Sequence, residues 1–454
     1  RPSDLTFTWA PSSANDWGTA TWNGTTTSGT FSTTSGTTFG NLSLANASTL
    51  SALTLGRYDG MTQANGTAYV LASSSDLTMN SSLAIGGTYK LYGGNLSVNA
   101  SLSSNGTGQS LLYANGDVGI NAAFNQTNGS SSALTISATG NITQSDSGNI
   151  SASGNSTLDV VMIANRQGTR ASNSISTRLG GITTNGGNLW VGGDIAGGVS
   201  GVWNGRTVGS GGTQITITGA LVLGAGSVML NQTPGTGLTS AFPNPSIPPQ
   251  INADGSIILV ADSFPSPYYI NLQSNGTIYL VPRSGNFGAQ LTLSDYGSSF
   301  YRDSFDGASG FPFRIRNMFV ASNDAAHPAS LIVGKYTGTG LTGDTQYQFN
   351  NTGNISFAAS LKPMSATETP YTNIVFYAGN MSLSGNLASA GGVTIHATGN
   401  VTQTNGTASL GYTFDGGNVS LTSASNALTS INANSVGNFT VVNAYKIGRA
   451  SCRE

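Results

Sequence analysis

The sequence predicts an all-β protein folded as a parallel β-helix, or β-solenoid. Three observations predict it: a repeated segment, a short kernel that recurs at a regular interval, and a scarcity of charge. Residues 134–144 read LTISATGNITQ and residues 393–403 read VTIHATGNVTQ, so two distant parts of the chain have nearly the same sequence. Such self-similarity is typical of repeat architectures, in which each repeat is one structural unit stacked on the next.

The kernel of the repeat is a Gly-Asn pair followed by an apolar residue and usually a serine or threonine. Near the C-terminus, kernels begin at Gly379, Gly399, Gly417 and Gly437, at intervals of 20, 18 and 20 residues. The alternation after each pair is that of a strand with one buried face, so we expect each kernel to be a corner. Glycine and asparagine tolerate positive φ, which predicts left-handed backbone there. The pairs expected to be structural corners are Gly94 and Asn95, Gly140 and Asn141, Gly379 and Asn380, Gly399 and Asn400, Gly417 and Asn418, and Gly437 and Asn438.

Stacking explains the composition, in which only 7% of the residues are charged. Equivalent positions on successive coils lie about 4.8 Å apart, where like charges repel, whereas serine, threonine and asparagine can form hydrogen-bonded ladders. With a net charge of -2 the chain has no basic surface for nucleic acid or anionic lipid. It also has no apolar run long enough to span a membrane, so we expect no membrane insertion of this segment.

Proline divides the chain into the parts that the sequence predicts. Nine of the 14 prolines fall between Pro243 and Pro328, where the kernel disappears and aromatic residues cluster. Because proline cannot donate a hydrogen bond to a sheet, we expect solenoid coils at 1–240, an excursion or embedded subdomain at 241–348, and coils again at 349–445. Residues 446–454 (KIGRASCRE), which include the single cysteine, resemble a translated sequencing adapter and are interpreted as a non-native tail.

The predicted excursion contains the densest group of charged and aromatic side chains. The candidate ligand-binding residues are Tyr296, Tyr301, Arg302, Asp303, Asp306, Arg314 and Arg316. Paired carboxylates could perform acid-base chemistry on a polysaccharide, and aromatic residues beside charges suit sugar binding without chemistry. The alternative is ordinary paired surface charge. We assign no catalytic residues and expect no enzyme activity, no metal site and no cofactor.

Two other features of the sequence bear on function. His396 stands where the near-copy has Ser137, at a position that the alternation places on the outward face. The arginines at 166, 170 and 178 form a short basic stretch that could meet an acidic glycan, although separated arginines more often lie in a solvated loop.

Two segment types resemble known bacterial surface proteins. Residues 181–194 (GITTNGGNLWVGGD) and the two ATGN segments resemble the repeats of filamentous-haemagglutinin-like exoproteins, which are exported by two-partner secretion. The opening TFTW, with Trp17 and Trp22, is similar to autotransporter passenger strands. The resemblance implies a right-handed coil.

The same resemblance implies a function and a location. It implies a secreted adhesin segment at the bacterial cell surface, acting as an elongated stalk in attachment to host surfaces, polysaccharide or neighbouring cells. The expected partners are surface glycans or proteins and the outer-membrane export machinery of the full-length protein. Two alternatives stay open: a polysaccharide-degrading β-helix enzyme, and a structural sheath or matrix protein without a specific ligand.

Overall fold

The computed structural model contains strands and turns and no α-helix among the residues that it describes, which confirms the predicted all-β parallel solenoid. Within that part of the chain no helix could cross a membrane. Apart from a few single residues, side chains are described for residues 50–55, 76–127, 131–166, 174–193, 211–234, 249–262, 274–287, 330–338, 348–357, 373–389, 391–434 and 436–444, and elsewhere only strand backbones are described.

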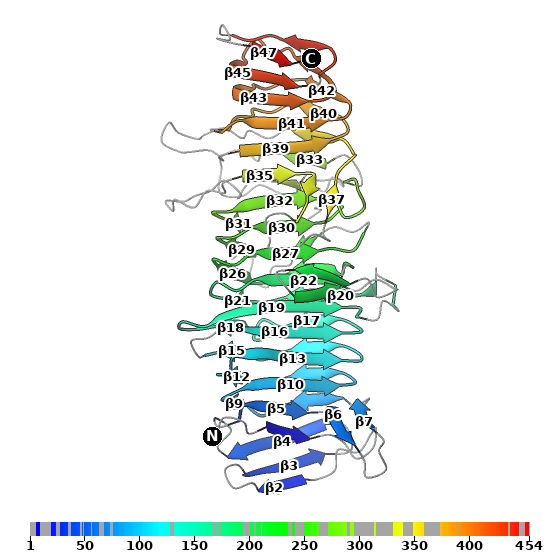
Figure 1. The fold of residues 1–454 in the computed structure, drawn as a ribbon, viewed down its shortest axis with the longest axis vertical. Helices are drawn as coiled ribbons and strands as arrows, with labels where there is room; N and C mark the ends of the chain where they lie inside the picture. Colours follow the sequence, from blue (N-terminus) through cyan, green and yellow to red (C-terminus); the bar gives the residue numbers. More distant parts are fainter. Residues whose placement is uncertain are drawn as a thin grey trace, which may run out of the picture. The chain divides into compact units, whose positions relative to one another are not determined.

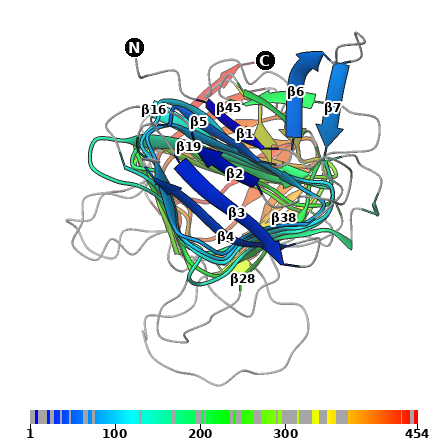
Figure 2. The same cartoon turned by 90° about the horizontal axis from the view of Figure 1, so that it is seen from below.

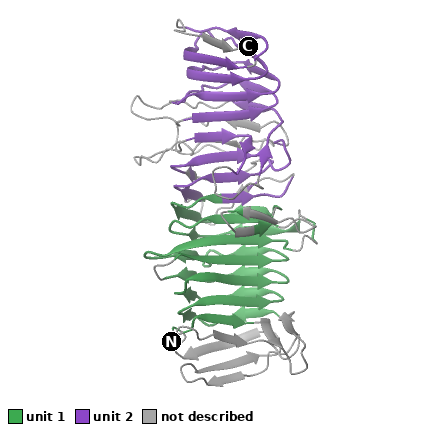
Figure 3. Ribbon diagram, viewed as in Figure 1, with its two compact units in different colours: residues 1–228, 241–249 green, residues 229–240, 250–454 purple. Residues whose placement is uncertain are grey.

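The chain forms two compact units (Figure 3). Unit 1 comprises residues 1–228 and 241–249, and unit 2 comprises residues 229–240 and 250–454.

Each coil of unit 1 consists of one long strand and two short ones, and equivalent strands of successive coils pair in parallel (Figures 1 and 2). The long sheet contains β1 (Thr6–Trp9), β5 (Ala52–Leu55), β10 (Thr88–Gly93), β13 (Gly108–Ala114), β16 (Ser131–Ala138), β19 (Thr157–Ala164) and β22 (Leu189–Gly193). The second sheet contains β8 (Leu77–Met79), β11 (Leu96–Val98), β14 (Val118–Ile120), β17 (Ile142–Gln144), β20 (Ser176–Leu179) and β25 (Gln214–Ile217). The third contains β9 (Leu83–Ile85), β12 (Leu102–Ser104), β15 (Phe124–Gln126), β18 (Ile150–Ala152), β21 (Ile182–Thr183) and β26 (Ala220–Gly224).

Unit 1 also has three antiparallel additions to its coils. Near the N-terminus they are β2 (Ala20–Asn23), β3 (Ser28–Thr34) and β4 (Thr38–Ala45), and the hairpin of β6 (Arg57–Thr62) with β7 (Ala68–Ala72). The third is the hairpin of β23 (Ser200–Trp203) and β24 (Arg206–Gly209).

Unit 2 repeats the parallel stacking. Its long sheet contains β27 (Val228–Asn231), β30 (Ile257–Val260), β32 (Thr277–Val281), β35 (Ser330–Val333), β39 (Asn373–Ala378), β41 (Val393–Ala397), β43 (Ser409–Asp415), β45 (Ala427–Asn434) and β47 (Ala450–Arg453). The first residue of β27 belongs to unit 1 and the others to unit 2. Its second sheet contains β34 (Phe313–Arg314), β33 (Leu291–Ser294), β38 (Ile355–Phe357), β40 (Met381–Leu383), β42 (Asn400–Gln403), β44 (Asn418–Leu421) and β46 (Phe439–Val441). The remaining strands are β28 (Thr239–Ser240), β29 (Gln250–Ala253), β31 (Asn271–Gln273), β36 (Lys335–Tyr336) and β37 (Phe349–Asn350).

The interval 241–348, predicted as an excursion, contains strands of the stack. β30 pairs in parallel with β32, β32 with β35, and β35 with β39. The described part of the interval therefore continues the coils. The prolines between 241 and 248 and between 263 and 270 lie outside the described residues. Residues 450–453, in the tail interpreted as non-native, pair with β45 as β47.

Stacked aliphatic side chains fill the interior of each unit. In unit 1, Leu91, Leu112, Ile136 and Met162 occupy equivalent positions on β10, β13, β16 and β19, and none has measurable exposure. In unit 2 the corresponding positions include Phe376 on β39, Ile395 on β41 and Phe414 on β43. Burial of each such side chain stabilises the fold by about 1.5–3 kcal/mol. The stacked apolar side chains of successive coils therefore form the core.

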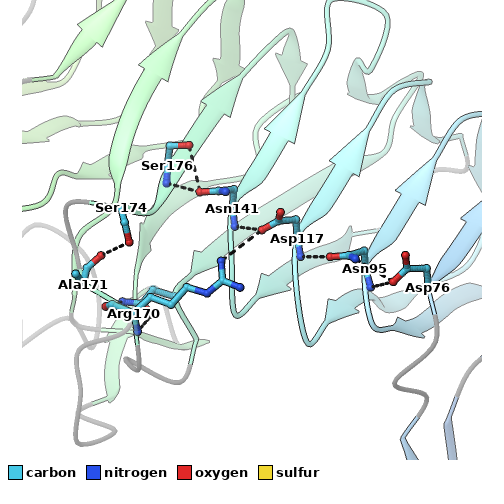
Figure 4. Close-up of polar contacts among 9 residues, drawn as sticks. Asp76, Asn95, Asp117, Asn141, Arg170, Ala171, Ser174 and Ser176 are labelled. Carbon is cyan, nitrogen blue, oxygen red and sulfur yellow. Dashed lines mark hydrogen bonds and ion pairs between the residues drawn. The ribbon is translucent and has the colours of Figure 1, made fainter. Parts of the chain in front are cut away.

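The corner of each coil is joined to the next by a polar ladder, which Figure 4 shows for unit 1. The backbone N–H of Asn95 donates to Oδ1 of Asp76 (2.8 Å), that of Asp117 to Oδ1 of Asn95 (2.9 Å), and that of Asn141 to Oδ1 of Asp117 (2.7 Å). The ladder ends at Ser176, whose N–H donates to Oδ1 of Asn141 (2.8 Å). Each side chain thereby supplies the acceptor that the next corner needs.

Unit 2 builds the same ladder from asparagine alone. The backbone N–H of Asn380 donates to Oδ1 of Asn354 (3.0 Å), and that of Asn400 to Oδ1 of Asn380 (2.8 Å). Nδ2 of Asn418 then donates to Oδ1 of Asn400 (2.9 Å), and the N–H of Asn438 to Oδ1 of Asn418 (2.9 Å).

The ladder explains the glycine of the kernel, and the reason differs from the expected positive φ. Gly417 has a φ of 75°, but Gly140, Gly399 and Gly437 do not lie in the left-handed region. A Cβ would instead lie 1.9 Å from Oδ1 of Asp117 at Gly140, 2.3 Å from the Oδ1 of the preceding coil at Gly399, and 2.5 Å at Gly437. Glycine is needed there because the ladder side chain of the preceding coil fills the space.

Gly140→Ala should lower the free energy of unfolding by about 1–3 kcal/mol, because the new Cβ displaces Asp117 from the N–H of Asn141. Gly119→Ala is the control, since its Cβ would meet nothing closer than 3.5 Å. Urea unfolding followed by circular dichroism measures both.

A double-mutant cycle tests the cause. If Asp117 is the obstacle, Asp117→Ala and Gly140→Ala together should cost less than the sum of the two single changes. Equal stability of Gly140→Ala and Gly119→Ala would contradict this explanation.

Two buried tyrosines brace the coils from within. The hydroxyl of Tyr89 donates to the carbonyl of Leu83 (2.6 Å) in unit 1, and that of Tyr412 to the carbonyl of Leu387 (2.7 Å) in unit 2. Burial raises the pKa of both phenols far above the ordinary value. At Tyr89 a hydrogen bond to the Ser103 carbonyl has a smaller effect on the pKa, in the opposite direction.

The free energy of unfolding should therefore fall steeply at alkaline pH. Above about pH 10 the unfolded tyrosines lose their protons while Tyr89 and Tyr412 keep theirs, so the free energy of unfolding falls by up to about 1.4 kcal/mol per pH unit for each. Urea unfolding between pH 8 and pH 11.5 should show a shallower decline when both residues are changed to phenylalanine. Tyr377→Phe should flatten the decline less, because burial raises the pKa of Tyr377 at a less buried site, and an unchanged slope in the double variant would refute the linkage.

Candidate functional site

The cluster predicted from sequence lies almost wholly outside the described residues. These are Tyr296, Tyr301, Arg302, Asp303, Asp306 and Arg316, and of Arg314 only the backbone, in β34, is described. No three His, Cys, Asp or Glu side chains come together as metal ligands in the described part of the chain.

A row of polar groups crosses the outward face of the long sheet of unit 2. It consists of Lys335, Tyr377, His396, Asp415 and Asn434, and we call it the outer row. Tyr377 pairs in register with His396, His396 with Asp415, and Asp415 with Asn434, so these four contribute one side chain from each of β39, β41, β43 and β45. Alternation along each strand buries the neighbouring residues and turns these outward.

The aromatic rings of the row stack on each other. The Tyr377 and His396 rings have centroids 4.4 Å apart and planes 12° apart. The Nζ atom of Lys335 lies 5.0 Å from the centroid of Tyr377. Lys335 begins β36, two residues after the end of β35, which pairs with the other side of β39. The Tyr377 ring is therefore held between an imidazole and an ammonium group.

His396 and Asp415 form the polar end of the stack. Nδ1 of His396 lies 3.0 Å from Oδ2 of Asp415, and the two side chains are 32% and 46% exposed. A carboxylate at Nδ1 favours the tautomer with its proton on Nδ1, so Nδ1 donates to Asp415 and Nε2 is left as a hydrogen-bond acceptor. Burial raises the pKa of Tyr377, and the charge of Asp415 raises it further, so the phenol stays a hydrogen-bond donor at neutral pH.

The equivalent place in unit 1 is covered. Tyr113 precedes Ser137 in the sheet as Tyr377 precedes His396. The guanidinium carbon of Arg166 lies 3.6 Å from the centre of the Tyr113 ring, and Nη1 of Arg166 also donates to the phenol oxygen. Ser137 is only 4% exposed, so the same repeat position is covered in one unit and accessible in the other.

The alternation in the sequence predicts that His396 faces outward, which the structure confirms, but it does not connect His396 to its neighbours. The signal was present, because each outward residue precedes the glycine of a kernel by two or three positions. Tyr377 precedes Gly379, His396 precedes Gly399, Asp415 precedes Gly417, and Asn434 precedes Gly437. Aligning the kernels would have brought the row together.

The basic stretch at 166–178 does not form one patch. Besides Tyr113, Arg166 contacts the carbonyl of Ala114 (3.0 Å) and the hydroxyl of Thr139 (3.2 Å) through Nη2. Arg170 lies 4.0 Å from Asp117 and Arg178 lies 3.4 Å from Asp146, both at exposed sites (Figure 4 shows the first).

Comparison with protein-family models, with curated proteins and with solved structures finds no match to this chain. The functional argument therefore rests on the residues described above.

Arg166→Ala should lower the free energy of unfolding by about 1–3 kcal/mol, because the Arg166 side chain contacts a ring and several oxygen atoms of the two preceding coils. Arg178→Ala should change it by less than about 0.5 kcal/mol, because an exposed ion pair contributes little. Urea denaturation compares the two, and equal losses would show that Arg166 is not a brace.

Proposed function

We propose that this chain is a segment of a secreted bacterial surface protein and that it acts in adhesion, as a β-solenoid that presents outward side chains to glycans or to neighbouring surfaces. The observation that carries the proposal is the contrast between the coil interior and the outer row. Aliphatic side chains fill the interior and polar ladders join the corners, whereas the outer row gathers five kinds of functional group on an accessible face.

The chemistry of the outer row suits binding better than catalysis. Its single carboxylate already contacts a histidine, and hydrolysis of a glycosidic bond commonly uses two carboxyl groups on either side of that bond. The proposal of an adhesin also accords with the resemblance of the kernels to filamentous-haemagglutinin-like repeats.

The test is saturable retention of the full chain on immobilised polysaccharides and glycoproteins, with release of reducing ends assayed in the same samples. An adhesin should be retained and should release none. Release that disappears in Asp303→Asn or Asp306→Asn would establish an enzyme instead. Absence of any saturable retention would favour a structural sheath or matrix protein.

A further inference from the structure

The outer row and the residues beside it form a regular grid of hydrogen-bonding groups. Two positions earlier on the same strands, and therefore on the same face, a second line contains Thr394, Thr413 and Asn432, which also pair in register. All three are at least partly exposed. The grid repeats once per coil, about every 4.8 Å.

The stacking in the row determines which atoms a ligand could reach. Because the faces of Tyr377 are turned to His396 and Lys335, the edges of the rings point away from the sheet. The groups available at the edges are the phenol hydroxyl, the Nε2 atom of His396 and the carboxylate of Asp415. A ligand would therefore meet hydrogen-bond donors and acceptors rather than an aromatic platform.

The spacing and the charge of the grid exclude two classes of polymer. An extended peptide advances about 3.3 Å per residue and would lose register with the coils after one step. A nucleic acid needs several cations to neutralise its phosphates, whereas the row has one lysine at one end and a carboxylate near the other. A neutral polymer with hydroxyl groups at each coil step remains.

We propose that the outer row binds a neutral, extended, β-linked polysaccharide that runs across the strands, with about one sugar residue to each coil. The pyranose repeat of such a chain is close to the coil spacing. Asp415 and the Nε2 atom of His396 accept hydrogen bonds from sugar hydroxyls, Tyr377 donates to a ring or hydroxyl oxygen, and Thr394 and Thr413 contact the other edge of the chain. This inference rests on the proposed adhesive function and names its ligand class.

The near-identical segment of unit 1 shows which side chain this position accepts in place of histidine. His396→Ser introduces the side chain that the near-identical coil has at Ser137, so the fold should be retained. Thr135→Ala is the control, because partly exposed Thr135 holds in unit 1 the position that Thr394 holds in the near-identical segment. Neither change alters the aliphatic core or the corner ladder.

Calorimetric titration of the full chain with cellohexaose and chitohexaose tests the inference, with maltohexaose and glucose as mismatched probes. The wild type should bind one of the extended β-linked hexasaccharides at least ten-fold more tightly than maltohexaose or glucose. His396→Ser and Asp415→Asn should each weaken that binding by about ten-fold or more, and Thr135→Ala should leave it unchanged. Urea midpoints confirm that the variants are folded.

The outcomes separate this inference from the proposed function. Retention on a polysaccharide that persists unchanged in His396→Ser and Asp415→Asn would overturn the assignment to the outer row and leave the adhesin proposal standing. Equal binding of maltohexaose and cellohexaose would also overturn it. If the wild type is retained on none of the polysaccharides or glycoproteins, both proposals fail.

Discussion

The structure depends on one requirement, that the backbone N–H at each corner of a coil finds an acceptor on the coil before it. Within a strand the parallel ladder supplies that acceptor, but at a corner the chain changes direction and the ladder is interrupted. A side-chain Oδ1 takes its place at Asp117 and Asn141, and again at Asn380 and Asn400. The Asn or Asp of one coil and the glycine of the next therefore act together, because the side chain supplies the acceptor and the glycine leaves room for it.

The same requirement accounts for the scarcity of charge. In unit 1 the ladder alternates Asp76, Asn95, Asp117 and Asn141, so no two carboxylates occupy adjacent coils. Two carboxylates about 4.8 Å apart would repel each other, whereas an amide between them can donate to one and accept from the other coil. In unit 2 the ladder is asparagine throughout, and charge is displaced to outward positions such as Asp415, where it contacts His396.

Much of this fold could be predicted from sequence, because stacking forces equivalent positions to repeat in the chain. The kernel located the corners, but it could not reveal that Gly140 makes room for Asp117, since the hydrogen bond that needs this space joins Asn141 to Asp117, 24 positions earlier in the sequence. The stacked strands β30, β32 and β35 were missed because Gly-Asn pairs are scarce between 250 and 338, where only Gly285-Asn286 occurs, and because prolines lie among them. The outer row was missed because its members come from different coils and share no residue type, so only the register of β39, β41 and β43 brings them together.

Hydrogen exchange at the corner amides, measured by nuclear magnetic resonance, tests the central claim most directly. If Oδ1 atoms of the preceding coil hold these groups, the N–H groups of Asn141, Asn380 and Asn400 should exchange as slowly as amides within the adjacent strands. Exchange of these three amides at the rate of the exposed turn at Gly154 would contradict the account.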